Sequence, residues 1–144
     1  MKSIFIFIGY LLALTLLTAC SKAAPDRLTE ELQTVKSWTA TSKMVADAWV
    51  RGAVPKVYAK QTLNKAQQEF QTETDNIAQI ESSTAIPQSY KLALLGHIKR
   101  LAKITEQMST AVEQENYSVV SQRLGDLSQE GQTLDSQLPQ QNKP

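Results

Sequence analysis

His97 is the only histidine in the chain, and imidazole is the side chain most often used for acid-base chemistry and metal binding. It lies between Leu94 and Leu101 on the apolar face of a predicted helix. A di-metal bundle needs a Glu-x-x-His motif on each of two helices, which one histidine cannot supply. Haem would need an axial partner, but Met108 lies on the same predicted helix and Met44 lies off the apolar stripe of its own helix. We therefore expect His97 to be a packing residue, with no cofactor and no metal.

Carboxylates are dense between residues 69 and 81 and are the second candidates for chemistry. Glu73 falls within an otherwise apolar helical stripe, as Ser42 does in the preceding one. Buried polar groups need partners, so we expect these two residues to satisfy each other across a helical hairpin and to fix its register. The sequence has no Gly-rich phosphate loop, Ser/His/Asp set or metal-ligand spacing. We therefore expect the protein not to be an enzyme.

Cys20 is the only cysteine, and the residues before it have the layout of a signal peptide. A basic Lys2 precedes an apolar run over 4–17, and small residues follow. The run is shorter than the ~20 residues that a membrane-spanning helix needs. Leu17-Thr18-Ala19-Cys20 resembles the bacterial lipobox, in which the cysteine thiol receives diacylglycerol and cleavage leaves that cysteine first.

This resemblance implies that residues 1–19 are a removed lipoprotein signal peptide and that Cys20 is the lipid attachment site, with palmitate-type acyl chains. Residues 20–25 would then be the lipidated cysteine and a short tether. Ser21 differs from the aspartate that holds lipoproteins in the inner membrane in enterobacterial-type sorting, which implies the outer membrane, facing the periplasm. The alternative is a secreted protein whose single cysteine happens to lie near the cleavage site. A lipid-blocked thiol could form neither a disulfide nor a metal site.

The charge balance indicates what the remaining chain does not bind. Of 15 Lys and Arg residues only Lys2 precedes Cys20, so 14 remain to balance 14 Asp and Glu residues. A formally neutral chain has no long-range attraction for nucleic acid or for an anionic membrane. Its length allows one domain.

Apolar residues recur at three- and four-residue steps in four segments, which predicts four helices. The segments run from about Asp26 to Arg51, from Pro55 to Glu81, from about Pro87 to Val112, and from Tyr117 to Leu138. With short connections, they predict an all-α, up-down-up-down four-helix bundle over 26–138, followed by a disordered tail over 139–144. A three-helix bundle with a long kinked element and an oligomeric coiled coil are the alternatives.

Capping residues predict where these helices begin. Asp26 is the expected N-cap of the first helix, Ser83 or Thr84 of the third and Asn116 of the fourth. The apolar series through 90, 97, 104 and 111 slips by one residue before it continues at 117, which favours a turn between two helices over one continuous helix.

The aromatic residues indicate the core and a partner surface. Trp38 and Trp49 match the apolar stripe of the first helix and are expected in the core, whereas Tyr58 and Tyr117 are expected to be more exposed. We therefore expect a non-enzymatic, lipid-anchored bundle that binds or scaffolds another envelope protein. The alternative is a bundle that binds a small apolar ligand between its helices, suggested by the small stripe residues Ala59, Ala66 and Gly131.

One family comparison adds a further alternative. The segment Gly96-His97-Ile98-Lys99-Arg100-Leu101, with Leu138-Pro139 near the end, is similar to the third and fourth helices of the PsbQ-like lipoproteins of cyanobacteria. Those proteins are short, lipobox-led four-helix bundles on the lumenal side of the thylakoid. The resemblance implies an accessory subunit of a photosynthetic membrane complex in the thylakoid lumen, and it carries over no binding residue.

Overall fold

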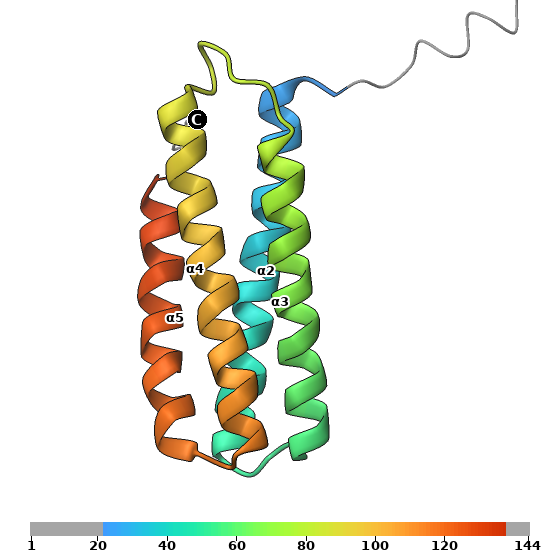
Figure 1. Ribbon diagram of the computed structural model, residues 1–144, viewed down its shortest axis with the longest axis vertical. Coiled ribbons are helices and arrows are strands. Elements are labelled where there is room, and N and C mark those ends of the chain that lie inside the picture. Colours follow the sequence, from blue (N-terminus) through green and yellow to red (C-terminus); the bar gives the residue numbers. More distant parts are fainter. Residues whose placement is uncertain (1–21, 138–144) are drawn as a thin grey trace, which may run out of the picture.

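The computed structural model describes residues 22–137, and this part of the chain forms four α-helices and no strand. The helices are α2 (Ala24–Val50), α3 (Lys56–Ala78), α4 (Gln88–Glu113) and α5 (Tyr117–Gln137), labelled as in Figure 1. The predicted all-α four-helix fold is thus confirmed. The expected signal peptide, the lipidated Cys20 and the 139–144 tail lie outside the described residues.

The four helices are arranged as an up-down-up-down bundle (Figure 1). Each helix packs against its neighbours in sequence, α5 also packs against α2, and α2 touches α4 across the diagonal. The start of α2, the α3–α4 connection and the end of α5 lie at one end of the bundle, called here the tether end. The connections over 51–55 and 114–116 form the opposite, far end.

The core is formed by the apolar stripes of all four helices. Burying each large aliphatic or aromatic side chain contributes roughly 1.5–3 kcal/mol. Those with almost no exposed surface include Val35, Leu63, Phe70, Ile77, Leu94, Ile98, Leu101, Met108, Leu127 and Leu134. Trp49 is buried as predicted, whereas Trp38 is only partly buried against the edge of the core.

α5 buries one residue in every seven, namely Val120, Leu127 and Leu134. Two other residues of its predicted apolar series lie beside this buried row rather than in it: Leu124 is partly buried and Tyr117 is exposed. The pattern predicted the helix correctly but overestimated the width of its buried face. α5 is therefore the most thinly packed of the four helices.

Prolines, rather than capping side chains, lie at the start of three of the helices. α2 begins at Ala24, so the expected N-cap Asp26 lies inside its first turn, next to Pro25. A proline suits the first turn because its fixed φ matches the helix and its missing N–H has no partner there. Pro87 occupies the N-cap position of α4, as Pro55 does in α3. Ser83 therefore does not cap α4; its Oγ accepts the Ile86 N–H at 3.2 Å within the connection.

α3 ends at Ala78, three residues before the predicted Glu81, because a side chain from α4 caps it. Lys91 Nζ donates to the carbonyl oxygens of Ala78 at 3.4 Å and Ile80 at 2.8 Å. A cation at a helix C-terminus satisfies free carbonyls and interacts favourably with the helix dipole. This also explains why Lys91 is buried.

The predicted turn between the third and fourth helices is confirmed. Asn116 Oδ1 accepts the Val119 N–H at 3.1 Å, which is the expected N-cap bond. Glu115 just before it has φ 55°, in the left-handed region, so the chain cannot continue as a single α-helix.

Candidate functional site

Cys20, the residue predicted to carry the lipid, lies outside the described residues. Within the bundle, two polar clusters and one aromatic contact are the candidates for function. The clusters lie between α4 and α5 and between α2 and α3, and the aromatic contact lies at the far end.

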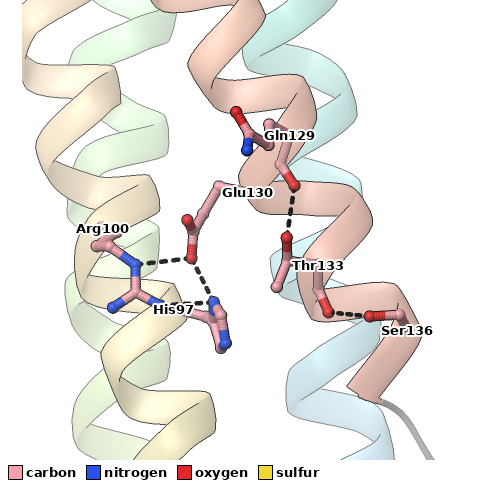
Figure 2. Close-up of polar contacts among 6 residues, drawn as sticks. All are labelled: His97, Arg100, Gln129, Glu130, Thr133 and Ser136. Carbon is pink, nitrogen blue, oxygen red and sulfur yellow. Dashed lines mark hydrogen bonds and ion pairs between the residues drawn. The ribbon is translucent and has the colours of Figure 1, made fainter.

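The cluster between α4 and α5 contains His97, Arg100 and Glu130 (Figure 2). Arg100 Nε donates to Glu130 Oε1 at 2.9 Å, and His97 Nδ1 contacts the same oxygen. Arg100 Nη2 also lies 2.7 Å from His97 Nδ1. His97 is largely buried, whereas about half of the Arg100 side chain is exposed. The three residues join α4 to α5 at the surface of the bundle.

The chemistry of imidazole decides how these contacts are arranged. A ring nitrogen can donate or accept one hydrogen bond, but not both, and a guanidinium can only donate. We assign the hydrogen to Nδ1, because Glu130 Oε1 then accepts from both His97 and Arg100. The two hydroxyl groups drawn with the cluster bond to their own helix: Thr133 Oγ1 donates to Gln129 O, and Ser136 Oγ donates to Thr133 O (Figure 2). The His97–Arg100–Glu130 cluster thus links two helices.

Glu130 was not singled out from the sequence, although a signal for it was present. α4 and α5 are antiparallel around the turn at Glu115, so residues at similar distances from that turn face each other. His97 and Glu130 satisfy this condition. The expectation that His97 is a residue of the core edge agrees with its burial.

The cluster between α2 and α3 brings together Glu31, Glu73 and Asn76. Asn76 Nδ2 donates to Glu31 Oε2 at 3.3 Å, and Glu31 lies within hydrogen-bonding reach of Glu73. Glu73 is 5% exposed, and its Oε2 has no hydrogen-bond partner among the described residues. Burial first, and then Glu31, raise the pKa of Glu73 to about 8. Glu73 is therefore protonated at neutral pH.

The predicted pairing of Ser42 with Glu73 is wrong. Ser42 Oγ is buried and has no hydrogen-bond partner among the described residues. In an antiparallel hairpin with its turn near Gly52, Glu73 lies opposite Glu31, and Ser42 lies about three helical turns farther along α2. A neighbouring buried hydroxyl does find a partner, since Ser109 Oγ donates to Asn64 Oδ1 at 2.5 Å.

The aromatic contact joins the far ends of α2 and α5. The rings of Trp49 and Tyr117 are stacked, with centroids 4.3 Å apart and planes 6° from parallel. Trp49 is buried, but Tyr117 is 50% exposed and covers it from the solvent side. Val57 and Tyr58, in the first turn of α3 at the same end, are also more than half exposed. The predicted exposure of Tyr58 and Tyr117 is confirmed.

Near the same end, two ion pairs join α3 to the end of α4 and to the connection that follows it. Lys56 Nζ lies 2.9 Å from Glu115 Oε1, and Lys60 Nζ lies 2.8 Å from Glu113 Oε2. The hydrogen bond that Lys56 donates to Glu115 raises the pKa of Lys56, and the hydrogen bond from Lys60 lowers the pKa of Glu113. All four side chains are well exposed, so these pairs orient the surface more than they stabilise it.

The small residues suggested for a ligand cavity are engaged in packing. Ala59 and Ala66 are fully buried in the core. A Cβ added at Gly131 would lie 3.2 Å from Thr39 Cγ2, so Gly131 lets α5 approach α2 closely. Beside it, a shallow groove of about 220 Å³ runs along these two helices, bordered by Lys36, Lys43 and Asp135.

Residues 22–137 contain no cluster of three or more His, Cys, Asp or Glu side chains that could hold a metal ion. None of the four described helices is long and apolar enough to cross a membrane.

Comparison with known proteins gives no further assignment: no family model, curated protein or solved structure matches this chain. The functional argument therefore rests on the residues and their geometry.

Proposed function

We propose that this protein is a non-enzymatic lipoprotein of the bacterial envelope, anchored through Cys20, whose far end binds another envelope protein. The position of Tyr117 is the observation that supports this proposal. Its half-exposed ring stacks on Trp49 at the end of the bundle opposite the start of α2. An anchor just before α2 would place this end farthest from the lipid surface.

The chemistry of the far end suits a protein partner. Tyrosine and tryptophan are enriched at the centres of interfaces because they bury a large area with few rotatable bonds. Tyr58 and Val57 add exposed area at the same end, and the pairs Lys56–Glu115 and Lys60–Glu113 supply a polar rim. A rigid bundle carrying such a surface can act as a scaffold without chemistry of its own.

The test compares two exposed residues at opposite ends of the bundle. The full-length protein and its Tyr117→Ala and Leu92→Ala variants are extracted from native membranes in a mild detergent, and copurifying proteins are quantified. Leu92 is the matched control because it is 57% exposed and lies near the tether end. We expect a stoichiometric partner with the parent and with Leu92→Ala, and at least a tenfold loss with Tyr117→Ala. Equal recovery from all three would contradict the proposal.

A second variant tests the absence of enzymatic chemistry. His97→Gln keeps a similar bulk but cannot act as a general base, because an amide does not titrate. We expect the folded variant to retain full partner binding. Loss of function in a variant whose circular dichroism and melting temperature match those of the parent would instead assign His97 a reactive role.

A further inference from the structure

We propose that Glu31 and Glu73 form a proton-operated latch that holds the tether end of α2 and α3 together and loosens it as the pH rises. This inference concerns the bundle alone and does not depend on the proposed partner. It rests on the burial of one carboxyl group, on its facing a second carboxyl group, and on the absence of a salt bridge from either group to a cation of residues 22–137.

The geometry requires a hydrogen between the two side chains. Glu73 is 5% exposed with Oε2 unpartnered among the described residues, and Glu31 is the group that faces it from α2. Two ionised carboxylates that face each other repel, and burial strengthens the repulsion. When Glu73 carries the hydrogen, its O–H can donate to Glu31, and Asn76 Nδ2 donates to the same carboxylate. The neutral form is thus fully compatible with the closed hairpin, and the ionised form is not.

The charged groups around the pair do not neutralise it. On α3, Glu69 adds negative charge and is itself paired with Lys65 at 2.5 Å. Lys22, just before α2, pairs with Glu30 of α2, and Lys36 of α2 pairs with Asp135 of α5. On α4, the nearby Lys91 is bound to the carbonyl oxygens of Ala78 and Ile80. No salt bridge joins a Lys or Arg to Glu31 or Glu73 within residues 22–137.

The sign of the pH dependence follows from linkage. The pKa of Glu73 is about 8 in the closed hairpin against an ordinary value of 4.5, so the closed form binds more protons than the opened form between these values. The stability that protonated Glu73 contributes to the closed hairpin is then fully present below pH 4.5 and is lost as the pH rises toward 8. Leu28, Leu32 and Ile77, which are buried at this end of the hairpin, would become accessible when it opens.

The test is hydrogen exchange of the full-length protein in detergent micelles at pH 6 and pH 8, with labelling times scaled to the chemical exchange rate. Peptides covering 28–35 and 70–78 should show an opening constant that increases about tenfold or more between the two pH values. Glu73→Gln should remove this increase, because the amide keeps a donor for Glu31 and does not titrate. Glu106→Gln, which removes an exposed carboxylate of α4, is the matched control and should behave like the parent.

Two results would overturn the latch: no pH dependence in the parent, or the same pH dependence in Glu73→Gln. If Glu73→Gln fails to fold, Glu31→Gln decides, because it removes the facing carboxylate and leaves Glu73 in place. A reduced pH dependence in Glu31→Gln supports the latch, and an unchanged one contradicts it.

Discussion

At the scale of single residues, some polar groups in the core stabilise the fold and others weaken it. Ser42 Oγ is buried without a partner among the described residues, whereas the Ser109 hydroxyl donates to Asn64 Oδ1. Burying a hydroxyl without a hydrogen bond costs about 1–3 kcal/mol, and a satisfied one makes a small favourable contribution. The same chemical group therefore acts in opposite directions at two positions of one core.

Replacing each serine with alanine tests this difference. Ser42→Ala should raise the free energy of unfolding by about 1 kcal/mol, because it removes an unsatisfied group and alanine favours the helix. Ser109→Ala should lower it by about 1–2 kcal/mol, because Asn64 loses its donor. Urea denaturation of both variants measures the two values. A loss of stability in Ser42→Ala would mean that its hydroxyl has a partner after all.

The sequence predicts which residues are buried better than it predicts how buried polar groups pair. His97, Trp49 and the aliphatic stripes were placed correctly because hydrophobic periodicity reports burial directly. The pairings of Glu73 with Glu31 and of His97 with Glu130 depend on how two helices align, which periodicity does not report. Counting outward from Gly52 identifies the Glu31–Glu73 pair, and counting outward from Glu115 places Glu130 within one helical turn of the residue opposite His97.

At the scale of helices, the close approach of α2 and α5 depends on Gly131. A Cβ there would lie 3.2 Å from Thr39 Cγ2, whereas a Cβ at Gly125 on the same helix would have no neighbour within 4 Å. Thr39 Oγ1 donates to Val35 O at 2.8 Å, which holds the methyl group in place. The two glycines thus share a helix but differ in their environment.

These glycines give a matched pair of substitutions. Gly125→Ala should raise the free energy of unfolding by about 0.8–1 kcal/mol, the difference in helix propensity. For Gly131→Ala, the gain in the free energy of unfolding should be at least about 1 kcal/mol smaller than for Gly125→Ala, because the new methyl group meets Thr39 or separates α5 from α2. Equal gains in urea denaturation would show that the α2–α5 contact adapts without cost. The comparison matters because α5 buries only one residue in seven.

Helix existence was predictable throughout, but helix boundaries were predictable only in part: the start of α5 after Asn116 was correct, and three other boundaries were not. Each of the four periodic segments forms a helix, because an apolar stripe must be buried against another element. The expected caps at Asp26 and Ser83 were overridden by Pro25 and Pro87, whose fixed φ starts a helix without a side-chain bond. The early end of α3 depends on Lys91 from α4, a tertiary contact that no local pattern contains.

At the scale of the whole molecule, the start of α2 and the end of α5 lie at one end of the bundle (Figure 1). Because α2 begins at Ala24, only three residues would separate a lipidated Cys20 from the first helical residue. Even if fully extended, they span about 10 Å. Attachment at Cys20 would therefore hold the tether end close to the lipid surface and direct the far end, with Tyr117, away from it.

The last prediction concerns this attachment. Two or more acyl chains on one residue anchor a protein durably, whereas a single chain does not, so Cys20 should account for all stable membrane binding. We expect the parent to incorporate labelled fatty acid and to sediment with membranes. Cys20→Ser should remain an uncleaved precursor without label, while Ser21→Ala, which keeps the thiol, should be processed and labelled like the parent. Because α2, α3, α4 and α5 bury their apolar residues against one another, a soluble fragment starting at Ser21 should keep the helical circular dichroism and cooperative unfolding of the bundle. A Cys20→Ser protein that is cleaved and sediments as the parent does would refute lipidation at this residue, whatever the stability of the fragment.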